Sequence, residues 1–196
     1  MNFRSDKSVL KQLIFLTDGA VTQESKLFSL INRELKTARL FTIGIGSAPN
    51  SFFMTRAAEI GRGSHIHIGD MDEISNRMSE LFSKIENPAV TDLKLILPKG
   101  FRAEVYPNPL PDLYVGDPLS IAIRGRNASG IAKITGKIGS QKWVARIPLD
   151  QGAAQIGIAK LWAREKISNL ERSRIALNPS ANQKAHIDSE LLQTAL

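Results

Sequence analysis

The sequence lacks cysteine, is poor in aromatic residues and has no long apolar run. Without cysteine among its 196 residues, disulfide bonds, thiolate metal sites and thiol catalysis are excluded. No apolar stretch approaches the roughly 18–20 residues that a membrane-spanning helix needs, so we expect no membrane span. The first ten residues also lack the apolar segment of a signal peptide. These absences are typical of a globular protein and do not determine its cellular compartment.

Runs of positive charge are missing as well, although the chain is basic overall. It has 26 Lys and Arg against 19 Asp and Glu, a net charge of +7. The basic residues are spread along the sequence without a run of five or six, and only two Trp and two Tyr could stack on bases. A nucleic-acid-binding surface needs clustered charge. We therefore expect no nucleic-acid partner.

Residues 11–88 alternate between strand and helix patterns. The continuous apolar run from Leu13 to Leu16 is typical of a parallel strand buried on both faces. Further strands are expected at 39–45 and 64–68, and apolar residues at helical spacing, over 27–35, 52–60 and 74–85, predict three helices. Three strand–helix units in succession predict parallel strands joined by right-handed crossovers.

Polar residues indicate where these helices begin. Thr22 and Ser51 are candidate N-caps, and Asp70 with Glu73 forms a pair similar to a capping box. The expected apolar faces consist of Leu27, Leu30, Ile31 and Leu35 in the first helix, Phe52, Phe53, Ala57 and Ile60 in the second, and Ile74, Met78, Leu81, Phe82 and Ile85 in the third.

The pattern changes after residue 88. Short alternating stretches separated by Gly, Pro and Asn predict an antiparallel sandwich-like domain over 89–152, with the proline-rich segment 106–111 as a connection. A helical segment follows over 153–196, and a large aromatic residue, Trp162, on its apolar face is expected to be buried. The first domain is expected to be 1–88.

Asp18 is the candidate site residue of the first domain. It follows an apolar strand and precedes Gly19, and ligands of open α/β sheets bind at the carboxyl ends of strands. A carboxylate there suits a hard cation, although Asp-Gly also simply forms turns.

Two histidines are a weaker candidate for a metal site. His65 and His67 share a strand face and could form half of a zinc site, but no further ligand suggests itself, and packing or solvation is favoured. A nucleotide loop around Gly44 and Gly46 is disfavoured, because Pro49 stands where a third glycine would be.

The segment Leu13-Ile14-Phe15-Leu16-Thr17-Asp18-Gly19 resembles the third metal motif of von Willebrand factor A domains. The stretch 40–46 resembles the next strand of that family. The run 52–63, followed by 68–70, is similar to the inter-alpha-trypsin inhibitor heavy chain type, including bacterial surface relatives similar to sortase targets. Segments 106–107, 111–114 and 161–164 extend the likeness beyond the A domain. The implied fold class is α/β, the C-terminal half of a doubly wound parallel-sheet domain with a small antiparallel β-domain and C-terminal helices.

The resemblance implies cation-dependent adhesion. Such a domain would bind Mg²⁺ or Mn²⁺, and the acidic group of a protein or matrix ligand would complete the metal shell at the cell surface. The family's Asp-x-Ser-x-Ser motif is absent, so only Asp18 carries over as a ligand, and we expect no tightly bound metal. No catalytic residue is expected. The alternative is a structural spacer that holds no metal, and a hydrolase using Asp18 ranks last.

The first strand carries a further expectation. If the family's preceding strands are absent, its edge is open, which favours association between copies. We expect a homo-oligomer formed through this edge, or a monomer in which the segment Ile187 to Leu196 covers it.

Overall fold

A computed structural model describes residues 10–47, 49–87, 89–176 and 179–195. They divide into two compact units. The α/β unit comprises the described residues up to Ala89 together with Tyr114–Gly116, and the antiparallel unit comprises Val90–Leu113 and the residues from Asp117 onward. The three domains expected from the sequence, 1–88, 89–152 and 153–196, stay a prediction about parts that fold independently.

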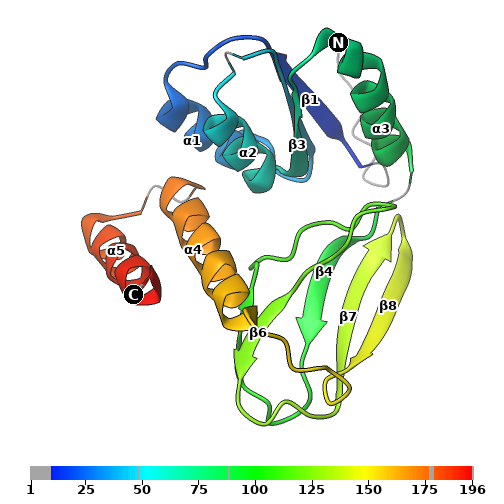
Figure 1. Cartoon of the computed structure of the whole chain (residues 1–196), viewed down its shortest axis with the longest axis vertical. Helices are drawn as coiled ribbons and strands as arrows, with labels where there is room; N and C mark the ends of the chain where they lie inside the picture. The colour runs from blue at the N-terminus through cyan, green and yellow to red at the C-terminus, as the bar shows by residue number, and fades with distance from the viewer. Residues whose placement is uncertain (1–9, 48, 88, 177–178, 196) are drawn as a thin grey trace. The chain divides into compact units, whose positions relative to one another are not determined.

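The α/β unit contains a parallel sheet with strand order β1-β2-β3. Helices lie on both faces of this sheet, α1 and α2 on one face and α3 on the other (Figure 1). The elements are β1 (Gln12–Thr17), α1 (Glu24–Glu34), β2 (Arg39–Ile45), α2 (Ser51–Ile60), β3 (Arg62–Ile68), the 3₁₀ turn η1 (Met71–Glu73) and α3 (Ile74–Glu86). The predicted α/β class with parallel strands is confirmed.

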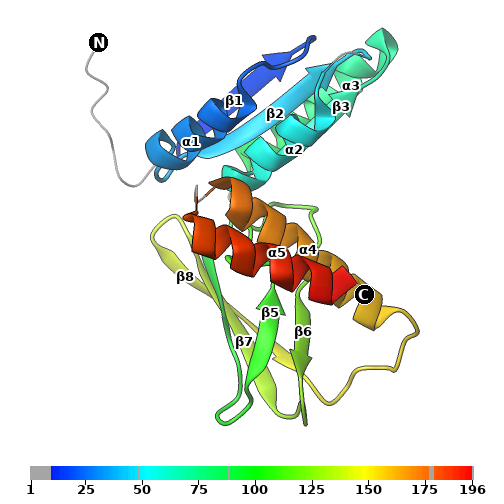
Figure 2. The same cartoon turned by 90° about the vertical axis from the view of Figure 1, so that its left-hand side faces the viewer.

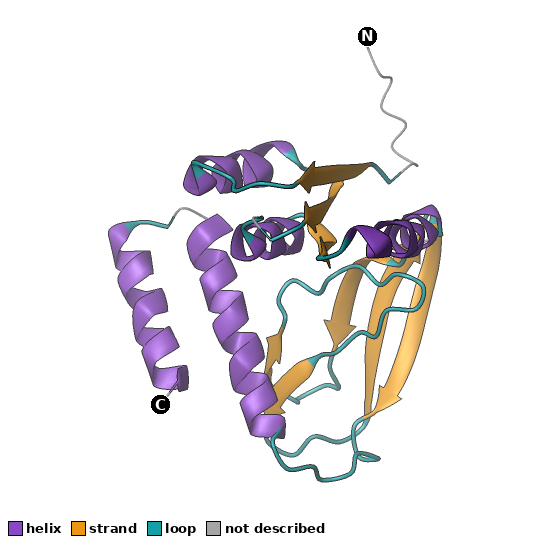
Figure 3. Ribbon diagram, turned by 45° about the horizontal axis from the view of Figure 1, so that its top comes forward, coloured by secondary structure: helices purple, strands orange, loops and turns teal. Residues whose placement is uncertain are grey.

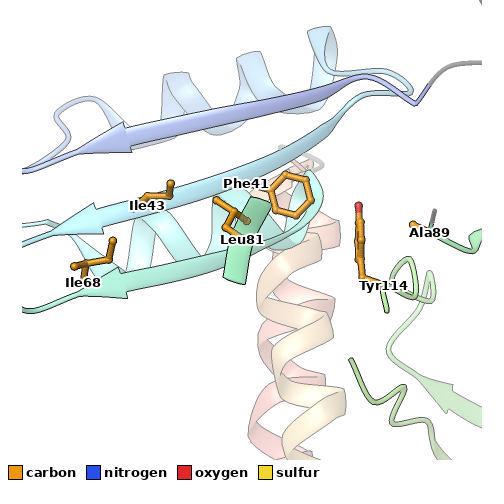
Figure 4. Close-up of a cluster of buried hydrophobic side chains, with 6 residues drawn as sticks. All are labelled: Phe41, Ile43, Ile68, Leu81, Ala89 and Tyr114. Atoms are coloured by element: carbon orange, nitrogen blue, oxygen red, sulfur yellow. The ribbon is translucent and has the colours of Figure 1, made fainter. Parts of the chain in front are cut away.

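The central strand β2 is buried on both faces. Phe41 and Ile43 are fully buried in a cluster with the α3 residue Leu81 (Figure 4). On the opposite face the buried Thr42 hydroxyl donates a hydrogen bond of 2.9 Å to the carbonyl oxygen of Met54 in α2. Helices on both sides of the sheet therefore account for the burial of β2 on both of its faces.

Strand β1 is exposed although its sequence is equally apolar. Leu13 and Leu16 are each 53% exposed, and Ile14 and Phe15 are 37% and 38% exposed. Within the described part of the chain β1 pairs only with β2, so its side chains have neighbours on one side. The expectation that Leu13–Leu16 is buried on both faces is wrong for this reason, whereas the expected open edge is present.

The helix starts differ from those predicted. Thr22 is not the N-cap of α1; that position is Gln23, with a left-handed φ of 60° and no capping side chain. Asn50, not Ser51, caps α2, since its Oδ1 accepts a 3.0 Å hydrogen bond from the amide of Phe53. Asp70 acts as a cap as expected, although it caps η1 by accepting from the amide of Asp72 at 3.3 Å.

Three large side chains that were expected on buried helix faces are exposed. Leu30, Phe52 and Phe82 are 45%, 55% and 42% exposed. In α1 the buried position is Phe28, whose ring lies 4.9 Å from that of Phe53 in α2. Because α1 contacts α2 through Phe28, the buried face of α1 includes Phe28 and not Leu30. Helical spacing alone does not determine which face of a helix is buried.

A tight glycine turn joins α2 to β3. A Cβ atom on Gly63 would lie 2.1 Å from the carbonyl oxygen of Leu40, and one on Gly61 would lie 2.3 Å from the Leu40 Cβ. No side chain fits at either position without displacing β2. The two glycines therefore let the chain enter β3 directly against β2.

The antiparallel unit contains two sheets and two helices. One sheet has strand order β4-β7-β8 (Figure 1), and the other pairs β5 with β6 (Figure 2). The elements are β4 (Thr91–Ile96), β5 (Ala103–Tyr106), β6 (Ala122–Gly125), β7 (Ile131–Ile138), β8 (Gln141–Pro148), α4 (Ile158–Ala176) and α5 (Ala181–Ala195). The segment after β5, with its prolines, is a connection as predicted.

The core of this unit lies on the inner face of the three-stranded sheet. It contains Val90, Leu93, Leu110 and Ile134, with Trp143 packed against it. The alternation predicted for β7 is confirmed, because Ala132 and Ile134 are buried and the residues between and after them face away. Leu119 and Ile121, which belong to one of the alternating stretches of 89–152, pack on this core just before β6 begins.

Helix α4 packs against β5 and β6, and α5 packs against α4 (Figures 2 and 3). Trp162 is 9% exposed, which confirms its predicted burial. Its ring lies 5.9 Å from the Tyr106 ring of β5, and the Arg124 guanidinium of β6 lies 4.6 Å from its centroid. The α4 interface with the sheet therefore centres on one tryptophan.

An ion pair links α5 to α4. Lys166 in α4 lies 2.7 Å from the Glu190 carboxylate and 3.8 Å from that of Glu104 in β5. The hydrogen bond that Lys166 donates to the Glu190 carboxylate raises the pKa of Lys166 above its usual range, and burial opposes this rise. The predicted helix over Ile187–Leu196 is real but begins earlier, at Ala181. Leu196 lies outside the described residues.

Candidate functional site

The candidate site is the edge of the parallel sheet at which β1, β2 and β3 end. Parallel strands bring their carboxyl ends to one edge, and α1 and α2 begin there because each follows a strand directly. Asp18 comes immediately after β1 and is exposed to solvent. The structure thus places this residue where the sequence predicted it, at a strand end open to a ligand.

The turn that carries Asp18 is held by its neighbours. The Thr17 hydroxyl accepts a hydrogen bond from the amide of Gly19 at 3.2 Å and lies 3.3 Å from the Gly19 carbonyl oxygen. Asp18 is exposed within this compact turn. Its carboxylate is available to solvent or to a cation.

The ends of β2 and β3 meet beside this edge. The amide of Gly46, a residue with a φ of 80°, donates a 2.8 Å hydrogen bond to the carbonyl oxygen of Ile68. Asp70 follows β3, but its side chain caps η1. A second carboxylate after a strand is therefore used for local structure.

The starts of α1 and α2 are joined by a contact that the sequence analysis missed. The Asn50 side-chain amide donates a hydrogen bond to the Glu24 carboxylate, and the Asn50 carbonyl oxygen caps α2. Asn50 directly precedes Ser51, and Asn is a strong N-cap. This preference was a signal that could have identified Asn50, whereas its partner Glu24 could not be read from the sequence.

The carboxylates at this edge do not form a metal site by themselves. Within the described ranges, no three or more His, Asp or Glu side chains are grouped closely enough to hold a metal ion. A hard cation such as Mg²⁺ needs several oxygen ligands. The described residues therefore fit a metal only in part, with Asp18 as one candidate ligand, and the weak binding expected for this chain stays a prediction.

His65 and His67 lie on β3 opposite Thr42 and Gly44 of β2. The His65 Nδ1 atom lies 3.0 Å from the Thr42 hydroxyl and 3.2 Å from the Thr42 carbonyl oxygen, and its Nε2 atom is buried without a hydrogen-bond partner. His67 is exposed. The two rings thus occupy different environments, in agreement with the favoured expectation of packing and solvation.

Burial sets the protonation of His65. It lowers the pKa of the ring below its ordinary value of 6.5, the hydrogen bond to the Thr42 backbone opposes this, and the charge of His67 lowers it further. Because the Thr42 carbonyl only accepts, Nδ1 carries the proton of the neutral ring. His65 is therefore a neutral packing residue near neutral pH.

Comparisons with known proteins agree with the α/β fold. The chain is 30% identical over 88 residues to one von Willebrand factor A domain-containing protein of Dictyostelium discoideum. The aligned segment covers 45% of this chain and 10% of that protein. The chain is 25% identical over 121 residues to another, covering 62% of this chain and 15% of that protein. The chain thus spans only a small part of these relatives. No protein-family model matches it.

A solved structure shows the same fold. The von Willebrand factor type A protein from Catenulispora acidiphila superposes with a TM-score of 0.53 and 17% identity, over 84% of this chain and 49% of that one. The homologues and this structural neighbour are von Willebrand factor A domain proteins. The parallel sheet with helices on both faces matches that class, and the antiparallel sheets are consistent with it.

Proposed function

We propose that the α/β unit serves as a protein-binding module in adhesion, with Asp18 contributing one ligand to a Mg²⁺ or Mn²⁺ ion. The homology to von Willebrand factor A domain proteins supports an interaction or adhesion module. The observation that carries the metal part is the position of Asp18, exposed at the carboxyl end of β1. The remaining ligands would come from groups that the described residues do not contain and from the acidic group of a bound protein or matrix ligand.

Three further parts of the proposal rest on the resemblance. They are the assignment to the inter-alpha-trypsin inhibitor heavy chain type, a location outside the cell or on its surface, and a role in binding and not in catalysis. No helix in the described ranges is long and apolar enough to cross a bilayer. The rival function is a spacer that holds no metal.

Paramagnetic Mn²⁺ tests the role of Asp18 in this chain. Mn²⁺ broadens the NMR signals of nuclei close to it, so titration should broaden the amide signals around Thr17, Asp18 and Gly19 first. We expect this only at high Mn²⁺ concentration, because one carboxylate leaves most of the shell to water. Asp18→Asn should abolish the effect, and Asp70→Asn, which removes a capping carboxylate, should leave it in place.

Two results would contradict the proposal in different ways. Equal broadening in the Asp18→Asn variant, or none near Asp18 at any concentration, would favour the spacer. Calorimetry supplies the second test, since a dissociation constant in the low micromolar range, on the order of that of a complete oxygen-ligand site, would show that the site is not incomplete.

A further inference from the structure

The outer face of the β4-β7-β8 sheet gathers basic residues that are scattered in the sequence. Successive strand residues point to opposite faces. In β7, Ala132 and Ile134 are 1% and 4% exposed against the core, whereas Lys133 and Lys137 are exposed. Five exposed cations from the three strands share this outer side: Lys94, Lys133, Lys137, Lys142 and Arg146. We refer to them as the basic face.

The strand register places these cations side by side. Lys133 lies opposite Arg146, and Lys137 lies opposite Lys142. Directly opposed residues of antiparallel strands have Cβ atoms roughly 4.5–5.5 Å apart, and like charges there repel. Such an arrangement costs stability in the free protein, and an anionic partner would remove this cost.

The counter-charge on the protein itself is small. Lys137 lies 3.5 Å from the Asp92 carboxylate, and both side chains are more than half exposed. Across the described part of the chain, the other four members of the basic face form no ion pair. Exposed pairs of this kind contribute little, so the face keeps most of its positive charge.

Aliphatic side chains stand among the cations. Ile96 lies opposite Lys133, and Val144 lies opposite Thr135. Ile96, Val144 and Ile131 are 50%, 48% and 53% exposed. The one tryptophan of these strands, Trp143, packs on the inner core, so the face offers no tryptophan for stacking on a base.

We propose that the basic face docks on a surface of anionic lipid headgroups. Clusters of four to eight Lys or Arg are attracted to such a surface. Aliphatic side chains can enter the boundary between headgroups and acyl chains, where they leave water. A nucleic acid or a sulfated polysaccharide would use the charge alone and leave Ile96 and Val144 without a role. This inference concerns the antiparallel unit and is independent of the function proposed for Asp18.

Vesicle binding tests the proposal with matched variants. The chain should cosediment with phosphatidylcholine vesicles that contain phosphatidylglycerol, and not with phosphatidylcholine alone. One variant removes three cations of the basic face (Lys133→Gln, Lys142→Gln, Arg146→Gln). The control removes the same number of exposed cations from α4 and α5 (Lys160→Gln, Arg164→Gln, Lys184→Gln).

We expect the basic-face variant to lose at least about tenfold in partitioning, since each cation near an anionic membrane contributes roughly fivefold. The control should bind nearly as well as the wild type. Ile96→Ser with Val144→Ser should weaken vesicle binding but leave retention on heparin unchanged. Circular dichroism checks that all variants fold.

Three results would overturn the proposal. Equal losses in the two triple variants would assign binding to net charge. Unchanged vesicle binding in the basic-face variant would place the lipid contact elsewhere. Retention on heparin or duplex DNA without binding to vesicles would identify a polyanion, not a membrane, as the partner.

Discussion

Each unit contains a sheet of three strands, which is parallel in the α/β unit and antiparallel in the other. The two sheets differ in which faces of their strands are buried. In the antiparallel sheet each strand alternates, so one face packs on the core and the other meets water. In the parallel sheet β1 and β2 carry apolar residues on both faces, and β2 is buried while β1 is exposed. Three strands suffice for the first arrangement and leave the second with an unburied edge.

The comparison shows that burial depends on neighbours more than on composition. Phe41 in β2 and Phe15 in β1 belong to the same sheet and to similar apolar runs. Phe41 is fully buried, and Phe15 is 38% exposed. A further layer of structure on the β1 side would make the two positions equivalent.

Truncating these two phenylalanines tests the comparison most directly. Phe41→Ala should lower the free energy of unfolding by about 3–5 kcal/mol, because it opens a cavity in a closed core. Phe15→Ala should cost about 1 kcal/mol or less, since its ring already contacts water. Chemical denaturation measures both. Similar losses would show that β1 is buried in solution.

The core between α4 and its sheet should respond almost as strongly. Trp162→Ala should cost about 3 kcal/mol, near the lower end for large aromatic residues, because its site lies close to the surface. Trp162→Phe is the matched control and should lose less, since a ring remains against Tyr106. A loss below about half a kcal/mol for the alanine variant would indicate that α4 does not depend on this contact.

The exposed edge should make copies of the chain associate. We expect sedimentation at several concentrations to show dimers or larger species, formed through β1. Replacing Ile14 and Leu16 with Lys should weaken association at least about tenfold, because charged side chains block pairing at strand edges. Leu30→Lys, at an exposed position of α1, is the control. A single monomeric species for the wild-type chain would contradict the expectation.

The smallest effect is a pH dependence centred on His65. Its pKa is lowered in the folded state, so below the ordinary value of 6.5 the unfolded chain binds the proton more readily. The contribution of His65 to stability is therefore present above that pH and is lost as the pH falls toward the lowered pKa. Denaturation across this range should show a loss that His65→Gln removes, whereas His67→Gln should reduce the loss only in part, because burial is the larger cause of the lowered pKa of His65.

A pH profile that His65→Gln leaves unchanged would assign the loss to other groups. The His65 ring faces Thr42 of β2, and the charge of His67 lowers the pKa of His65. The difference between the two histidine variants is therefore the informative quantity.

The sequence predicted the repeating units well and their surroundings poorly. The strand and helix order of the α/β unit follows from apolar runs and helical spacing, and the alternation of β7 follows from its pattern. The exposure of Leu13 could not be read from the run itself, because the run is the same whether or not another strand lies beside it. Phe28, not Leu30, faces α2 because two helices meet, which is a tertiary effect.

The same limit applies to functional residues. Asp18 was found because it stands at a strand end. The basic face was missed, since its five cations are separated by up to about fifty positions in the sequence and come together only through the register of three strands. The absence of charge runs excludes a cluster of cations that are adjacent in the sequence. It does not exclude a cluster that forms when strands pair in a sheet.

The glycines between α2 and β3 have a consequence for how this protein can vary. Gly61 and Gly63 leave no space beside Leu40, and the pairing of β2 with β3 already holds one extra β3 residue between the Leu40 and Thr42 positions, so a second added residue would not be absorbed there. An insertion there would shift β3 by one position along β2, and a shift of one reverses the face of every strand side chain. His65 would then leave Thr42 and turn toward Leu81, and Ile68 would leave the core. The length of this connection is thus fixed as firmly as its composition, and natural or engineered changes in loop length should be confined to the other turns of the unit.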